Sequence, residues 1–184
     1  MDAALESLHA FLSEEGIKLT VVNKSKDALS CEVAFEAPPV KDKQEFHRWI
    51  RREPSDNFLM ASVRRKDDVI KAQVISKNAL LAVHKKTKKI GNKLEEVLRD
   101  NTPHYLEDSE VDTFEQAIEE MYEMSELSEN LLYQTIAPQS DTMELLCEFK
   151  EATNHVFLAY EELIEEHTHS TYHSLIEIND QIAS

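Results

Sequence analysis

The stretch that decides the fold spans residues 76–99 and reads SKNALLAVHKKTKKIGNKLEEVLR. Its apolar residues recur at steps of three and four, which is the spacing of one face of an α-helix. They are Leu80, Val83, Ile90, Leu94, Val97 and Leu98. Only 2 of the 184 residues are glycine, and glycine is among the poorest helix formers. The segment therefore predicts a long amphipathic helix.

Two further segments on the C-terminal side have the same period. One runs from Ser109 to about Ile136, and the other covers residues 140–166. Only a short turn at residues 137–140 joins them, which predicts that the two helices run antiparallel. The sequence thus predicts a mainly α fold, with a helical hairpin or bundle and coiled-coil-like packing over residues 76–166.

The N-terminal residues predict a small α-β-β unit. A helical stripe over residues 2–15 ends at Gly16, where a left-handed residue closes many helices. Alternation with period two over residues 17–36 predicts a β-hairpin with one buried face. A short helix over residues 40–52 follows and contains Trp49. We expect Trp49 to anchor the core, with an interface hot spot as the alternative.

Residues 55–75 fit two structures. A helix is favoured because neither possible strand alternates strictly and no glycine marks a turn. The chain would then divide into an α/β unit over residues 1–54 and a helical bundle over residues 55–184, with a basic first helix and an acidic C-terminal hairpin. The alternative is a second hairpin with strands at 58–64 and 69–75. It would give an α+β fold, in which a four-stranded antiparallel sheet precedes the long helices.

The net charge of −16 is distributed unevenly along the chain. Residues 1–40 carry −4, residues 41–93 carry +9 and residues 94–184 carry −21. Helical surfaces usually mix both signs and so gain pairs between residues four apart. This asymmetry indicates that the acidic half pairs either with the chain's own basic helix or with a basic partner.

Composition and motifs argue against several function classes. Two distant glycines, Gly16 and Gly91, cannot build the Gly-rich phosphate loops of nucleotide-binding proteins. Cys31 and Cys147 are expected to be reduced, buried thiols. No spacing nominates a catalytic set, so the sequence predicts a protein that is not an enzyme and has no cofactor. Because a signal peptide and an apolar run of ~20 residues are both missing, we expect a cytoplasmic protein without a membrane span.

The acidic helix carries the leading function hypothesis. It predicts a non-enzymatic protein-interaction module, acting as an adaptor, regulator, inhibitor or complex subunit. The partner would be a protein with a basic surface, and a homo-oligomer is a further expectation. The candidate binding residues are Glu115, Glu119, Glu120, Glu123 and Glu126.

Two alternatives from other classes remain open. The basic segment over residues 48–93 could bind nucleic acid, because lysine side chains neutralise phosphates. Its candidate residues are Lys85, Lys86, Lys88, Lys89 and Lys93. The C-terminal segment could instead bind a metal ion, because Glu166, His169 and His173 would share one helical face and imidazole with carboxylate suits divalent metals.

Overall fold

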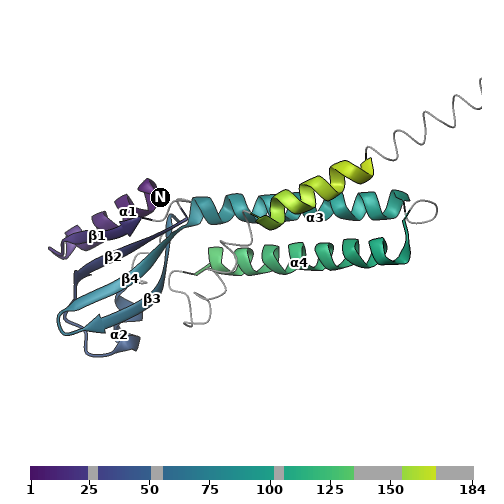
Figure 1. The fold of residues 1–184 in the computed structure, drawn as a ribbon. Helices are drawn as coiled ribbons and strands as arrows, with labels where there is room; N and C mark the ends of the chain where they lie inside the picture. Colours follow the sequence, from purple (N-terminus) through teal and green to yellow (C-terminus); the bar gives the residue numbers. More distant parts are fainter. Residues whose placement is uncertain (25–28, 51–55, 102–105, 135–154, 169–184) are drawn as a thin grey trace, which may run out of the picture. The chain divides into compact units, whose positions relative to one another are not determined.

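The computed structural model describes residues 1–24, 29–50, 56–101, 106–134 and 155–168. The described residues form helices and a four-stranded antiparallel sheet, so the fold is mixed α+β (Figure 1). The elements are α1 (Asp2–Glu14), β1 (Leu19–Lys24), β2 (Ser30–Glu36), α2 (Lys43–Ile50), β3 (Phe58–Lys66), β4 (Val69–Ser76), α3 (Lys77–Asn101), α4 (Asp108–Leu132) and an unlabelled helix over residues 155–168.

The residues fall into two compact units. One, the sheet unit, comprises residues 1–83 and 127–148, and the other, the three-helix unit, comprises residues 84–126 and 149–184. The domain boundary predicted between residues 54 and 55 stays a prediction. Residues 58–76 nevertheless belong to the sheet and not to a helical bundle.

The prediction of a helix over residues 55–75 is wrong. Residues 58–76 form the hairpin β3–β4, which pairs through β4 with β2 and gives the strand order β1-β2-β4-β3. The four-stranded alternative is the correct one. Strict alternation is absent because Phe58, Leu59, Met60 and Ala61 are all buried. A strand that is covered on both faces loses the polar positions that would reveal its period.

Two local features also concealed the hairpin. The register shifts between Ala61 and Arg64, where Ser62 has a φ of 49°. Such a bulge adds a residue to one strand and interrupts its alternation. The turn between the strands contains Asp67 at a φ of 54°, so an aspartate takes the left-handed conformation that glycine usually supplies.

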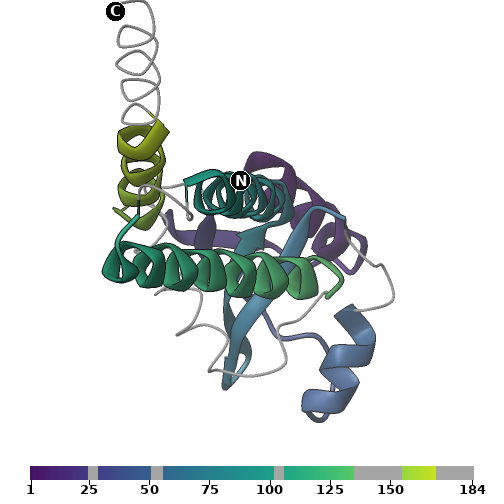
Figure 2. The same cartoon turned by 90° about the vertical axis from the view of Figure 1, so that its right-hand side faces the viewer.

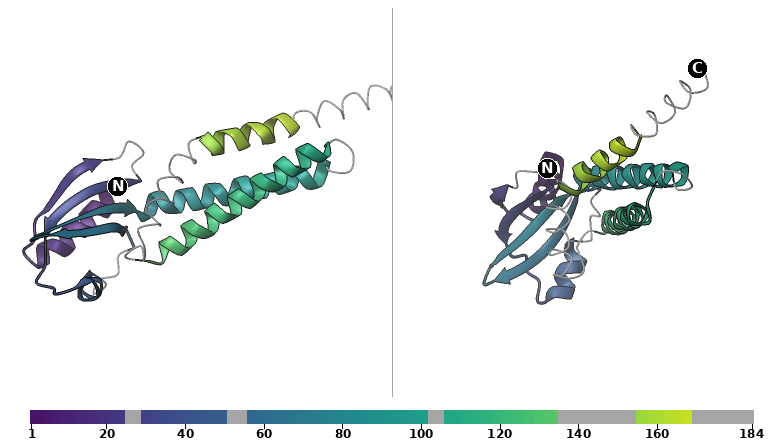
Figure 3. Two further views of the ribbon diagram at one scale, coloured as in Figure 1. Left: turned by 60° about the horizontal axis from the view of Figure 1, so that its bottom comes forward. Right: turned by 45° about the vertical axis from the view of Figure 1, so that its right-hand side comes forward.

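The main core covers one face of the sheet. Cys31, Val33 and Phe35 of β2 point into it, as the alternation predicted. Helices α1 and α2 pack there, and Figure 3 shows α1 against the strands. Trp49 is 8% exposed, and its ring meets Phe11 edge to face at a centroid distance of 4.9 Å. The expectation that Trp49 is a core anchor is confirmed.

A second, smaller cluster lies on the other face of the sheet. Leu59, Ala61 and Ile75 contact the first turn of α3 through Leu80 and the last turn of α4 through Leu131. The predicted end of the first helix is also confirmed. Gly16 has a φ of 72°, and Ile17 N–H donates to the carbonyl of Leu12 at 2.9 Å, which closes α1 in the Schellman manner.

The three-helix unit contains the antiparallel pair of α3 and α4 (Figure 1). The helices come close together at Gly91, where a Cβ atom would lie 3.4 Å from the Cβ of Met121. Two turns earlier in α3, His84 Nδ1 donates to the carbonyl oxygen of Ser125 at 2.9 Å. The helix over residues 155–168 lies beside them (Figure 2) and buries Phe157. Of the antiparallel partner predicted over residues 140–166, residues 155–166 are helical, and residues 135–154 lie outside the described residues.

Candidate functional site

Helix α4 separates its apolar and acidic residues onto different faces. Its buried positions repeat at steps of three and four and include Phe114, Ala117 and Met121. The exposed face carries six carboxylates with the same spacing, which we call the acidic stripe: Asp108, Asp112, Glu115, Glu119, Glu123 and Glu126. At about 1.5 Å per residue the stripe is about 27 Å long.

No described residue neutralises the charges of the acidic stripe. None of its six side chains takes part in an ion pair or hydrogen bond with another residue that the structure describes. The sequence contains neither Lys nor Arg between Arg99 and Lys150, so α4 cannot form oppositely charged pairs within itself. The stripe therefore presents only negative charge to solvent, and its members repel one another.

Glu120 lies apart from the other four predicted glutamates. It is half-buried and accepts a hydrogen bond from the hydroxyl of Tyr160 on the helix over residues 155–168. The pKa of Tyr160 is raised above its ordinary value. Burial is the largest cause, and the hydrogen bond to Glu120 and the charge of Glu120 add to it. The structure thus places Glu120 in a helix–helix contact, while Glu115, Glu119, Glu123 and Glu126 share the exposed stripe.

The predicted lysines also divide into two groups. Lys86 lies 3.5 Å from Glu161 and 5.2 Å from the centre of the Phe157 ring, so it helps to hold the third helix. The other four are exposed and have no ion-pair partner within the described ranges. We call them the basic stripe: Lys85, Lys88, Lys89 and Lys93. Pairing of the basic helix with the acidic half is therefore limited, among described residues, to Lys86 and Glu161.

Only one of the three residues of the metal hypothesis is among the described residues. Glu166 lies exposed on the helix over residues 155–168, but His169 and His173 lie outside the described residues. Within the part of the chain that is described, no three His, Cys, Asp or Glu side chains form a group that could hold a metal ion. Cys31 is buried as predicted, and Cys147 falls outside the described ranges.

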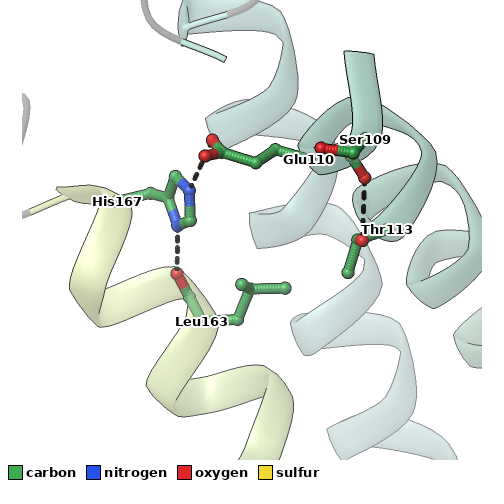
Figure 4. A network of polar contacts seen from close by, with 5 residues as sticks. All are labelled: Ser109, Glu110, Thr113, Leu163 and His167. Atoms are coloured by element: carbon green, nitrogen blue, oxygen red, sulfur yellow. Dashed lines mark hydrogen bonds and ion pairs between the residues drawn. The ribbon is translucent and has the colours of Figure 1, made fainter. Parts of the chain in front are cut away.

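His167 has a structural role that the sequence did not reveal. Its Nδ1 donates to the carbonyl oxygen of Leu163 at 2.9 Å, and its Nε2 lies 3.4 Å from Glu110 Oε2 on α4 (Figure 4). Its ring meets Phe114 edge to face at 4.9 Å. His167 thus fixes the C-terminal end of the described helix to the start of α4. Its spacing gave no signal, because Glu110 and Phe114 lie more than fifty residues away in the sequence.

The comparisons with known proteins assign no family. No protein-family model matches the chain, and neither the search of curated proteins nor that of solved structures returned a significant match. None of the described helices is long and apolar enough to cross a membrane. A functional interpretation must therefore come from the stripes themselves.

Alkaline pH is expected to destabilise the three-helix unit through Tyr160. The unfolded chain ionises this tyrosine near its ordinary pKa of about 10, whereas the folded chain keeps it protonated there because its pKa is raised. Above about pH 10 the unfolded state binds fewer protons than the native state, so the free energy of unfolding falls as pH rises. Denaturant unfolding at about pH 8 and about pH 11 should show a smaller loss for Tyr160→Phe than for the unmodified chain.

The matched control for this experiment is Tyr133→Phe. Tyr133 is 83% exposed, so its removal should leave the alkaline loss of stability unchanged. Equal losses in the unmodified chain and in Tyr160→Phe would contradict the assignment.

Proposed function

We propose that this chain is a non-enzymatic interaction protein, of the adaptor, regulator, inhibitor or complex-subunit kind, that binds the basic surface of another protein through its acidic stripe. The observation that carries the proposal is the row of six exposed carboxylates without a described partner. A regular helix holds them in one line, so they can meet a row of cations without first being ordered.

Electrostatic complementarity explains how such a stripe would recognise a partner. A single-sign surface raises the rate of encounter with an oppositely charged one and disfavours acidic partners. Each solvent-exposed pair contributes about 0.2–1 kcal/mol. Four glutamates acting together would thus contribute about 1–4 kcal/mol to binding. Because salt screens exposed charges over a Debye length of about 8 Å at physiological ionic strength, binding should weaken as salt increases.

Affinity capture from a native cell extract tests this proposal. The stripe variant Glu115→Gln, Glu119→Gln, Glu123→Gln, Glu126→Gln removes four charges from the binding surface. The control variant Glu6→Gln, Glu14→Gln, Glu36→Gln, Glu96→Gln removes four exposed charges elsewhere. We expect the unmodified chain and the control to retain the same basic protein at low salt, and the stripe variant to lose it. Equal retention by both variants would contradict the proposal.

Nucleic-acid binding is the second candidate, because the basic stripe is exposed and lacks a described ion-pair partner. Four lysines within nine residues can contact successive phosphates. The net charge of −16 acts against this function, since the field of the whole chain repels a polyanion. Retention of nucleic acid by the unmodified chain, and its loss after Lys85, Lys88, Lys89 and Lys93 are changed to glutamine, would favour this candidate.

A further inference from the structure

The two stripes lie at the same height along the axes of α3 and α4. The contact of His84 with Ser125 pairs one end of the basic stripe with one end of the acidic stripe. Further along, the hydroxyl of Tyr122 donates to Asn92 Oδ1 at 3.4 Å. Because α3 and α4 run antiparallel between these contacts, residues 85–93 lie alongside residues 115–126. The unit therefore presents a positive row and a negative row side by side.

Part of each stripe lies on one shared side of the helix pair. At about 100° per residue, Lys85 and Lys88 lie within about 40° of Asn92 around α3. Glu115 and Glu126 lie within about 40° of Tyr122 around α4. Asn92 and Tyr122 are hydrogen-bonded to each other. These charged residues therefore lie on either side of the line along which α3 and α4 meet.

The third helix leaves this side uncovered. It is held by Lys86 and by Glu120, which lie about 120° from Asn92 and about 160° from Tyr122 on their respective helices. Lys85, Lys88, Glu115 and Glu126 therefore lie on the side of the pair turned away from residues 155–168. Lys93 instead lies within about 20° of Lys86 around α3, and Glu123 lies about 60° from Glu120 around α4. The exposed part of Tyr122, 37% of its surface, lies between the two stripes.

We propose that a second copy of this chain docks on this side, with its basic stripe against the acidic stripe of the first copy. A two-fold axis along the helix pair exchanges the places of α3 and α4. It would therefore set each basic stripe opposite an acidic one at the same level, which is the self-complementary arrangement that a two-fold dimer requires. The inference rests on the proposed function, because it uses the same acidic stripe and names one occupant for it.

The dimensions and numbers of the stripes agree with this arrangement. Lys85–Lys93 extends over about 12 Å and Glu115–Glu126 over about 16 Å along their helices. Each row has two charges near the shared line, Lys85 and Lys88 on α3 and Glu115 and Glu126 on α4. The other two of each row, Lys89 and Lys93 and Glu119 and Glu123, lie about 60–100° from Asn92 or Tyr122 around their helices. The remaining negative charge of the two copies opposes association, but salt screens charges that lie more than about 8 Å apart. Dimerisation should thus be strongest at moderate salt and should be lost at high salt.

Charge exchange between two variants tests the dimer. The first variant changes Lys85, Lys88, Lys89 and Lys93 to glutamate, so both of its stripes are acidic. The second changes Glu115, Glu119, Glu123 and Glu126 to lysine, so both of its stripes are basic. All eight positions are exposed, and circular dichroism checks that each variant folds. A milder pair with glutamine at the same positions replaces any variant that does not fold, and each should dimerise at least tenfold more weakly than the unmodified chain.

Sedimentation velocity on the purified full-length chains gives the readout. We expect the unmodified chain to dimerise, each variant alone to be monomeric, and the equimolar mixture to form a one-to-one dimer. A monomeric unmodified chain would overturn the inference. So would variants that dimerise as well as the unmodified chain, or a mixture that stays monomeric. For the milder pair, an unchanged dimerisation constant would do so.

The experiments distinguish a failure of this inference from a failure of the proposed function. A dimer that captures no other protein would support this inference and contradict the proposed binding of a different partner. A monomer that captures a basic protein through the acidic stripe would support the proposed function and overturn the dimer.

Discussion

Replacing Trp49 with alanine is expected to lower the free energy of unfolding of the sheet unit by about 3–5 kcal/mol. The side chain is 8% exposed and contacts Phe11 of α1 at 4.9 Å and Phe46 of α2 at 5.7 Å between ring centroids. Truncation removes this apolar contact and leaves a cavity at the point where both helices meet the sheet. Aromatic pairs contribute about 0.5–1.5 kcal/mol beyond the area that they bury. Urea unfolding followed by circular dichroism measures the change.

Arg48→Ala is the matched control for this prediction. Arg48 precedes Trp49 in α2 but is exposed, so its loss should change stability by less than about 0.5 kcal/mol. If Trp49→Ala left the stability unchanged and weakened binding of a partner, the alternative of an interface hot spot would be correct instead.

Replacing Phe114 with alanine is expected to have an effect of similar size in the three-helix unit, about 3–5 kcal/mol. Phe114 is fully buried in α4 and meets the His167 ring at 4.9 Å. The change removes the aromatic surface against which His167 holds the end of the third helix. Native-state hydrogen exchange should therefore show faster exchange over residues 155–168.

Phe114→Leu separates the loss of volume from the loss of the aromatic contact. A leucine keeps most of the buried apolar surface, so we expect a smaller loss of stability together with faster exchange in the third helix. Gln116→Ala changes an exposed residue of the same helix and should alter neither quantity. Unchanged exchange over residues 155–168 in Phe114→Ala would show that His167 does not depend on Phe114.

The helices could be predicted from sequence because each is covered on one side only. Predicted at 76–99, α3 spans Lys77–Asn101, and α4, predicted from Ser109, spans Asp108–Leu132. In both, an exposed polar face keeps the 3.6-residue period visible. The first helix ended where Gly16 indicated, because a left-handed residue outside a helix favours glycine strongly.

The second hairpin could not be predicted in this way. Its Phe58–Ala61 segment is buried on both faces, because α1 and α2 cover one and Leu80 with Leu131 the other. Those covering residues are distant in sequence, so the segment's own residues do not indicate that both of its faces are buried. The turn at Asp67 lacked the glycine that would have marked it.

The candidate surface was predicted in part. Four of the five predicted glutamates, Glu115, Glu119, Glu123 and Glu126, share the exposed stripe, because a row on one side of a helix follows from spacing alone. Glu120 and Lys86 instead contact the third helix. The position of that helix depends on tertiary packing, which spacing within α3 or α4 does not reveal.

The dissociation constant of the captured basic partner tests the central claim most directly. It should be measured for the unmodified chain, for the variant with glutamine at Glu115, Glu119, Glu123 and Glu126, and for the four-glutamine control outside the stripe. The account predicts at least tenfold weaker binding for the stripe variant, which corresponds to about 1.4 kcal/mol, and a change within about twofold for the control. Equal Kd values for the two variants would contradict the acidic stripe as the binding surface.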